Sequence, residues 1–223
     1  MTAFNPETQS LLFDLDGTLI DTPKGFQKLL QDLDWKIKDF DYMAHYYCGL
    51  NLQALLEHVL VDTNNLDEKL KEFINLYYEN IDQYTFFYPG VSEGLKYFSD
   101  NHIKWGIVSN KEHSQCVKIC QDFNLDPIFL LGSGVIPFTK PHPAPLVKAA
   151  KKIGVKPYNC YYFGDMPTDI QASEHALMQA VYCQYGCYHY LDPCYTYSKV
   201  CTKFEDMYDI CHLSTATNTG AVL

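Results

Sequence analysis

The sequence predicts an α/β protein built on a doubly wound parallel sheet, with an all-helical segment inserted after the first strand. Three observations support this prediction. Short apolar stretches alternate with helical patterns of about ten residues along most of the chain. One block, residues 22–86, carries helical spacing only. Polar side chains follow the first, second and fourth predicted strands, at the end of a parallel sheet where ligands bind.

The first strand is indicated by an uninterrupted apolar run at Leu11, Leu12 and Phe13, which is typical of a strand buried on both faces. Later stretches repeat this pattern, and each is separated from the next by a helix-forming stretch. The predicted strands are 104–109, 128–131, 160–163 and 180–183, and the predicted helices are 91–100, 112–123, 143–153 and 168–178. Because helices connect the strands, we expect a parallel sheet covered on both faces.

The helical block begins at Thr22 and Pro23, which predict a helix N-cap and a proline in the first turn. Apolar residues then recur at helical spacing in three stretches, 26–33, 52–59 and 66–81. Pro89-Gly90 ends the block. We therefore expect a core domain formed by residues 1–21 and 87–213, a helical cap domain formed by residues 22–86, and a disordered polar tail at 214–223.

Composition limits the classes of function. The formal net charge of −10 argues against nucleic acid or an anionic membrane as the main partner. All 17 basic residues are lysines, so no guanidinium is present to grip a carboxylate or phosphate in two places. No apolar run reaches membrane-spanning length, and nine cysteines without zinc-site spacing predict reduced thiols in a cytoplasmic protein. No protein partner is identifiable from the sequence.

Two carboxylates follow the first strand directly. Asp14 and Asp16 are separated by one residue, and Gly17 lets the chain curl so that both can reach one point. Two carboxylates gathered there are costly unless a cation compensates them. Mg²⁺ accepts one or two carboxylates together with phosphate oxygens, so the stretch predicts a Mg²⁺ site that handles a phosphate. The alternative is a solvated turn, since Asp and Gly are common turn residues.

Other polar residues fall at the same end of the predicted sheet. Ser109 ends the second strand and Asp165 follows the fourth. Ser109 could instead cap the following helix. Three further polar residues, Lys140, Lys111 and Asp169, also have possible structural roles. Lys140 could be a surface lysine, and Lys111 could form an exposed salt bridge. Asp169 could cap a helix or hold Lys140 by an ion pair instead of contacting a metal.

Four segments, in order, resemble the motifs of the haloacid dehalogenase-like hydrolases. They are DLDGTLID at 14–21, VSN at 108–110, Lys140 in TKPHPAP, and GDMPTD at 164–169. The chain is most similar to phosphoglycolate phosphatases with a helical cap. The resemblance implies a Rossmann-like core and a Mg²⁺-dependent phosphatase that forms an aspartyl-phosphate and acts on a small phosphorylated metabolite. The departures are a cap without a known specificity signature and Met166 inside the fourth motif.

The resemblance also implies roles for individual residues. Asp14 is the expected nucleophile, Asp16 the general acid and base, and Lys140 the cation that neutralises phosphate and nucleophile. The metal is expected on Asp14, Asp165 and the Asp16 carbonyl, with Asp169 supporting Lys140 behind them. The expected substrate-binding residues are Gly17, Thr18, Ser109, Asn110 and Lys111.

The resemblance leaves the substrate open. Asp16 argues against dehalogenases and phosphonatases, which replace it, and the lack of arginine argues against a β-phosphoglucomutase. Phosphoglycolate is the first expectation, and a sugar-phosphate phosphatase, nucleotide phosphatase or pyrophosphatase is the alternative. A different class of function, a binding or regulatory protein on an inactive hydrolase scaffold, is disfavoured because all four motifs are intact.

Overall fold

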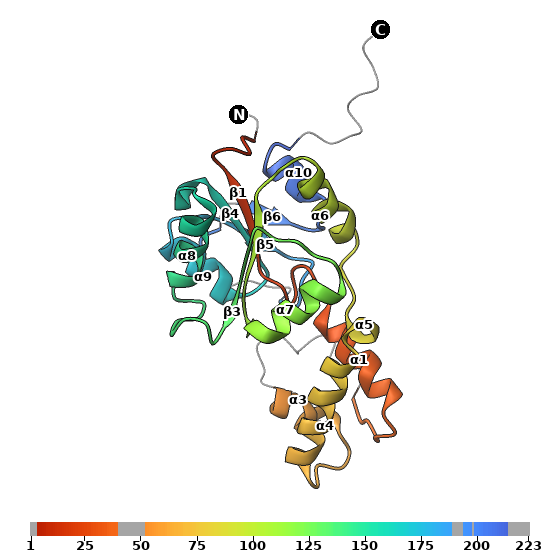
Figure 1. Ribbon diagram of the computed structural model, residues 1–223. Helices are drawn as coiled ribbons and strands as arrows, with labels where there is room; N and C mark the ends of the chain where they lie inside the picture. The colour runs from red at the N-terminus through yellow and green to blue at the C-terminus, as the bar shows by residue number, and fades with distance from the viewer. Residues whose placement is uncertain (1–3, 40–51, 189–193, 198, 214–223) are drawn as a thin grey trace.

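A computed structural model describes residues 4–39, 52–188, 194–197 and 199–213. Its sheet has six parallel strands in the order β3-β2-β1-β4-β5-β6 (Figure 1). The strands are β1 (Ser10–Phe13), β2 (Trp105–Glu112), β3 (Phe129–Ser133), β4 (Cys160–Gly164), β5 (Gln179–Cys183) and β6 (Lys199–Cys201). This order confirms the predicted doubly wound parallel sheet.

Strand β1 is central because all four of its residues are buried and it pairs with β2 on one side and β4 on the other. The chain first adds β2 and β3 on one side of β1, then crosses over to add β4, β5 and β6 on the other. The topological switch point therefore lies between β1 and β4, where open α/β sheets bind ligands. Strand β6 was not predicted, because three residues of which only Cys201 is buried give no pattern to detect.

Helices cover both faces of the sheet, as predicted. Figure 1 shows α8 (Ala144–Ile153) and α9 (Pro167–His175) on one side, and α6 (Val91–Asp100) and α10 (Asp206–Ile210) on the other. Alternating side chains of β1 divide between these layers. Leu12 packs with the residues of α8 and α9, whereas the Phe13 ring stacks at 6.1 Å from Phe98 of α6 and 6.2 Å from Phe204 before α10.

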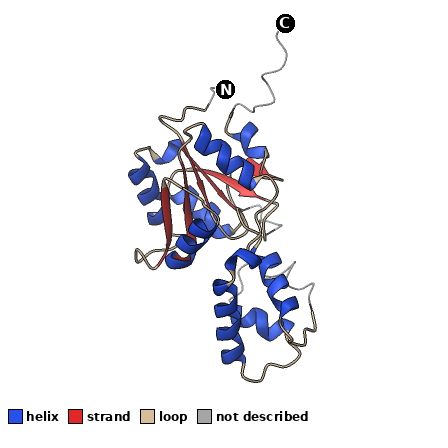
Figure 2. Cartoon of the chain, turned by 45° about the vertical axis from the view of Figure 1, so that its right-hand side comes forward, coloured by secondary structure: helices blue, strands red, loops and turns tan. Residues whose placement is uncertain are grey.

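The described residues between 22 and 86 form a group of helices beside the carboxyl end of the sheet, and we call them the helical segment (Figure 2). Its described helices are α1 (Thr22–Asp32), α3 (Leu52–Val59), α4 (Leu66–Glu79) and α5 (Ile81–Tyr84). The ring of Phe26 in α1 meets Phe73 and Tyr77 of α4 edge-on, at 5.2 and 4.8 Å. As expected, no strand occurs in the described part of the segment, which has an isolated bridge between Ile37 and Leu60.

Several local predictions differ from the structure. Asp21, not Thr22, caps α1, because its carboxylate accepts a hydrogen bond from the Lys24 amide at 3.0 Å. The third predicted helix breaks at Asn80 into α4 and α5. Strand β2 continues through Glu112, so the following helix, α7 (His113–Asp122), starts one residue later than predicted.

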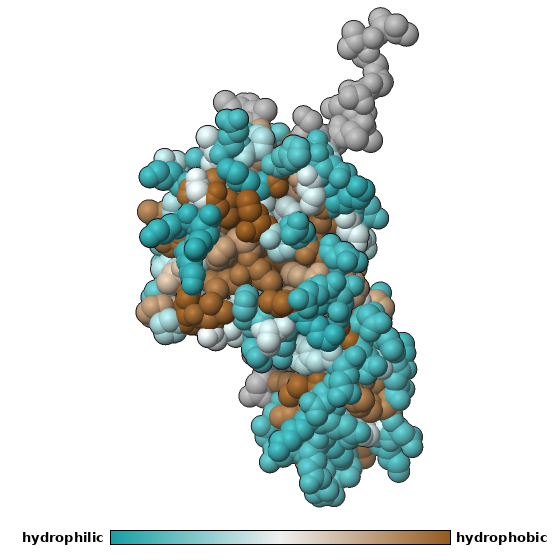
Figure 3. Space-filling view, viewed as in Figure 1, coloured by the Kyte–Doolittle hydropathy of each residue, from teal (hydrophilic) through white to brown (hydrophobic). Residues whose placement is uncertain are grey.

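The predicted tail at 214–223 lies outside the described residues. In the described part of the chain, no helix is long and apolar enough to cross a membrane. In the view of Figure 3, hydrophilic residues dominate the surface of the helical segment, and a hydrophobic area lies on the part of the molecule that contains the sheet.

Candidate active site

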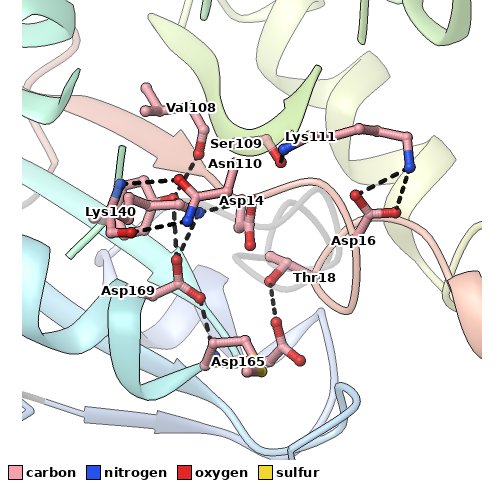
Figure 4. Close-up of polar contacts among 12 residues, drawn as sticks. Asp14, Asp16, Thr18, Val108, Ser109, Asn110, Lys111, Lys140, Asp165 and Asp169 are labelled. Carbon is pink, nitrogen blue, oxygen red and sulfur yellow. Dashed lines mark hydrogen bonds and ion pairs between the residues drawn. The ribbon is translucent and has the colours of Figure 1, made fainter. Parts of the chain in front are cut away.

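Three buried carboxylates meet at the switch point between β1 and β4. Asp14 follows β1, Asp165 follows β4, and Asp169 lies in the first turn of α9. One oxygen from each carboxylate lies within 4.8 Å of the others, and all three residues are buried (Figure 4). We call these residues the carboxylate cluster. They converge because β1 and β4 are hydrogen-bonded neighbours and Asp14 donates its amide to the Phe163 carbonyl at 2.8 Å.

Lys140 is the buried cation beside the cluster. Its Nζ lies 2.8 Å from Asp14 Oδ1 and 2.6 Å from Asp169 Oδ1, and it donates to the Tyr162 hydroxyl at 2.8 Å. Tyr162 in turn donates to the Val108 carbonyl at 2.6 Å, so β4 and β2 both fix the ammonium group. Burial opposes the charged form of Lys140, but the two carboxylates outweigh it and raise its pKa above the ordinary value.

Opposing effects act on the pKa of the Asp14 carboxyl group. Burial raises its pKa to about 6, while Lys140 pulls it down and Asp169 pushes it up. Its Oδ1 atom has Lys140 within ion-pairing distance but, among the described residues, accepts no well-directed hydrogen bond. A buried carboxylate oxygen in this state retains lone pairs for a further cationic partner.

Close packing around Asp165 depends on two glycines. Gly17 has a φ of 78°, and a Cβ there would lie 2.3 Å from Asp165 Oδ2. A Cβ on Gly186 would lie 2.1 Å from the Gly17 carbonyl oxygen. The loop after β5 can therefore approach closely, and the Cys187 amide donates to Asp165 Oδ2 at 2.9 Å.

The carboxylate cluster fits a divalent cation. Three buried carboxylates face one buried ammonium group, Lys140, so negative charge is in excess where water is excluded. Carboxylate oxygens are the donors that hard cations such as Mg²⁺ prefer. The sequence predicted that the carboxylates of Asp14 and Asp16 reach one point, whereas in the structure Asp14 lies with Asp165 and Asp169 instead.

Asn110 and Ser109 join the end of β2 to the site. The Asn110 side chain accepts a hydrogen bond from the Lys140 amide and donates one to the Lys140 carbonyl, both at 2.9 Å. Ser109 is buried, and its hydroxyl accepts from the Lys111 amide at 3.2 Å. Helix α7 begins four residues after Ser109, so Ser109 is not its N-cap. Asn110 holds the backbone that carries Lys140, a role the sequence did not indicate.

Asp16 turns away from the carboxylate cluster (Figure 4). Its Oδ1 lies 3.0 Å and its Oδ2 3.2 Å from Lys111 Nζ, and Thr22 also donates to Oδ1. Thr22 is the first residue of α1, after the N-cap Asp21, and its hydroxyl contacts Asp16. The Lys111 side chain is 7% exposed, so its pairing with Asp16 is not the exposed salt bridge considered from the sequence.

Residues 11–183 match the family described as haloacid dehalogenase-like hydrolase. The chain belongs to the haloacid dehalogenase-like hydrolases. The match spans the sheet from β1 through β5 and includes the carboxylate cluster, Lys140 and the helical segment.

Relatives with assigned names agree with this membership. The chain is 31% identical over 199 residues to the phosphoglycolate phosphatase of Colwellia psychrerythraea, covering 82% of this chain and 87% of that protein. It is 34% identical over 172 residues to that of Aquifex aeolicus, covering 74% and 80%. A crystal structure of a predicted phosphoglycolate phosphatase from Haemophilus somnus is similar in fold, with a TM-score of 0.73, 23% identity, and coverage of 92% and 98%.

Most of the site residues predicted from the sequence of this haloacid dehalogenase-like hydrolase lie together in the structure. Others make contacts that were not predicted. Thr18 is buried, with its hydroxyl 3.5 Å from Asp165 Oδ1. Asp169 pairs with Lys140, as one of the two sequence interpretations held. Tyr162 and the 186–187 loop were missed. A tyrosine inside an apolar strand has the pattern of a core residue, and a glycine and a cysteine 17 and 18 residues beyond the fourth motif carry no local signal.

The charge balance at Lys140 leads to a stability prediction. Lys140→Met should leave Asp14 and Asp169 buried without their cation and lower the free energy of unfolding by about 3–5 kcal/mol at pH 7 without metal. The loss should shrink as the pH falls, because protonation neutralises the buried carboxyls. Urea unfolding measures it, and the matched Lys140→Met/Asp169→Asn variant should recover part of it. A loss below about 1 kcal/mol for the single variant would contradict the argument.

Proposed function

We propose that the protein is a Mg²⁺-dependent phosphatase of small phosphomonoesters that acts through an aspartyl-phosphate, with phosphoglycolate as the first candidate substrate. The buried carboxylate cluster with Lys140 at its side is the observation that carries the proposal. The named phosphoglycolate phosphatases among the relatives support the choice of substrate. The predicted cytoplasmic location remains part of the proposal.

In this proposal, Asp14, Asp165 and the Asp16 carbonyl hold the cation, and Asp169 holds Lys140. When bound, Mg²⁺ neutralises the phosphate and the carboxylates so that two anions can approach each other. Lys140 adds a positive charge on the other side of Asp14. Gly17 and Thr18 lie in the loop after β1, and Ser109 and Asn110 lie toward the end of β2. These four residues would bind the phosphate oxygens through backbone N–H groups and hydroxyls.

Asp14 and Asp16 divide the covalent chemistry. A carboxylate oxygen of Asp14 attacks phosphorus, the bond from phosphorus to the ester oxygen breaks, and the departing alkoxide takes a proton from Asp16. Asp16 then removes a proton from a water molecule that attacks the aspartyl-phosphate. The bond between phosphorus and the Asp14 oxygen breaks, inorganic phosphate leaves, and both side chains return to their initial states.

The helical segment would act as a cap over this site. Its two links to the core lie side by side: the Asp21 amide donates to the Phe86 carbonyl at 2.7 Å, and the Tyr88 amide donates to the Leu19 carbonyl at 3.1 Å. Adjacent links of this kind let a segment rotate as one body. Closure would exclude water and strengthen the electrostatic interactions at Asp14. It would also favour small phosphorylated metabolites over phosphoproteins and nucleic acids.

A substrate panel tests the proposal. Purified protein with Mg²⁺ should hydrolyse phosphoglycolate with a higher kcat/KM than a sugar phosphate, a nucleoside monophosphate or a phosphopeptide, and inorganic phosphate release measures each. A sugar phosphate or nucleotide hydrolysed best would move the substrate to the alternative class while retaining the chemistry. A phosphopeptide hydrolysed best would contradict the closing cap, and no hydrolysis of any of them, nor of para-nitrophenyl phosphate, would favour a binding protein.

A further inference from the structure

Lys111 occupies an unusual position between the two parts of the molecule. Lys111 lies near the carboxyl end of β2. Its Nζ contacts both carboxylate oxygens of Asp16, at 3.0 and 3.2 Å. The same Nζ lies 5.9 Å from the ring centre of Tyr77 and 5.7 Å from that of Tyr78, both on α4 of the helical segment. The faces of aromatic rings attract a cation at such distances. Lys111 therefore contacts the core and the helical segment at once.

The contacts of Asp16 are incompatible with acid–base catalysis in this arrangement. Thr22 and Lys111 both donate to its carboxylate, and Figure 4 shows the carboxylate directed toward Lys111 and away from Asp14. A general acid must come within hydrogen-bond reach of the oxygen that it protonates. Asp16 must therefore exchange its present partners for the ester oxygen when substrate binds.

The charges around the site indicate what could replace Asp16 at Lys111. Lys140 is already engaged by Asp14 and Asp169, and the chain has no arginine. Lys111 is the ammonium group whose carboxylate partner is required elsewhere during the reaction. The side chain of Lys111 is 7% exposed, whereas that of Asp16 is 27% exposed, so moving Asp16 away takes a carboxylate from a largely buried cation, which costs free energy. A second anionic group on the substrate removes this cost.

We propose that Lys111 determines substrate specificity by binding a second anionic group of the substrate, and that this group releases Asp16 for catalysis. The inference rests on the proposed phosphatase function. The substrate class is then a phosphomonoester with a carboxylate or second phosphate a few bonds from the ester oxygen. This short separation follows because Asp16 moves only from Lys111 to the ester oxygen, while the second anionic group takes the place of Asp16 at Lys111. Tyr77 and Tyr78 keep Lys111 in place during the exchange, so the helical segment takes part in recognition.

The test compares two substrates of similar size in four proteins: the unaltered protein, two Lys111 variants and one control variant. Phosphoglycolate carries the second anion, whereas 2-hydroxyethyl phosphate has a hydroxyl in place of the carboxylate. Lys111→Met should lower kcat/KM for phosphoglycolate by about 10- to 100-fold, the value of a hydrogen bond to a charged group. It should lower kcat/KM for 2-hydroxyethyl phosphate by less than about 3-fold, so the preference for the dianionic partner disappears. Lys111→Arg, which keeps the charge, should retain a preference for phosphoglycolate.

Lys118→Met is the matched control, because Lys118 is an exposed lysine on α7 paired with Asp122. It should leave both substrates unchanged. Equal losses on both substrates in Lys111→Met would mean that Lys111 only positions Asp16, and unchanged kinetics would mean that it takes no part; either result overturns the inference while the phosphatase function stands. Failure of the unaltered protein to hydrolyse either substrate would refute the proposed function, and the inference with it. Should Lys111→Met fail to fold, Lys111→Gln gives the same comparison.

Discussion

Asp14→Ala should abolish phosphatase turnover, with a loss of more than about 10⁴-fold in kcat, because the variant has no oxygen to attack phosphorus. The fold should survive the change. Asp169 remains 2.6 Å from Lys140 Nζ, so the buried ammonium group keeps a carboxylate partner. Phosphate release under saturating substrate measures the loss, and mass spectrometry of acid-quenched protein should detect no phosphorylated species.

Asp16→Asn is the informative comparison for Asp14→Ala. Removing a general acid and base should cost on the order of 10²–10⁴-fold. With para-nitrophenyl phosphate, whose leaving group needs no proton, the Asn variant should still be phosphorylated slowly and should accumulate the aspartyl-phosphate, because no base activates water. Wild-type turnover by Asp14→Ala, or phosphorylation of that variant at another residue, would show that the roles are assigned wrongly.

EDTA should reduce activity by more than about 10³-fold, since a catalytic cation contributes several kcal/mol of charge stabilisation. Mg²⁺ should restore activity, and Ca²⁺ should be a poor substitute because it favours more ligands at longer distances. The pH dependence follows from Asp14. Its pKa is raised to about 6 by burial, so below about pH 6 a proton competes with the cation and the Mg²⁺ concentration needed for half activity should rise.

A readout besides activity controls for the metal experiment. A cation that binds only the folded protein should raise the unfolding temperature, and Asp165→Asn should reduce that rise. Full activity in metal-free buffer would refute the metal-dependent reaction, whatever the effect on stability.

The centre of the fold was predictable because its signals are local. The apolar run at 11–13 predicts a buried strand. The alternation of strands and helices along the chain predicts parallel strands, whose carboxyl ends bring Asp14, Ser109 and Asp165 to one edge of the sheet. Elements whose signal depends on distant parts of the chain were missed. Strand β6 exists because β5 provides a partner along Val181–Cys183, a fact that three residues cannot encode alone.

The same distinction separates the predicted and unpredicted parts of the site. The motif around Lys140 predicted that this lysine belongs to the site, but it did not predict the residues that hold Lys140 in place. Asn110 was expected to offer its backbone N–H to phosphate, but the contact of its side chain with the Lys140 backbone was not predicted. Nor was the contact of Tyr162 with Lys140, because Tyr162 lies in a strand with the pattern of ordinary core. The Asp16–Lys111 pair joins residues 95 positions apart, and spacing along the chain does not reveal such a contact.

The attachment of Lys140 to β2 and β4 has a wider consequence. Lys140 is held to the sheet through Asn110 and Tyr162, and these contacts do not involve the helical segment. The helices contribute Tyr77 and Tyr78 to the surroundings of Lys111. The charge that neutralises phosphate in the proposed reaction thus depends on the sheet alone, so the helices could diverge toward new metabolites while Lys140 kept its place.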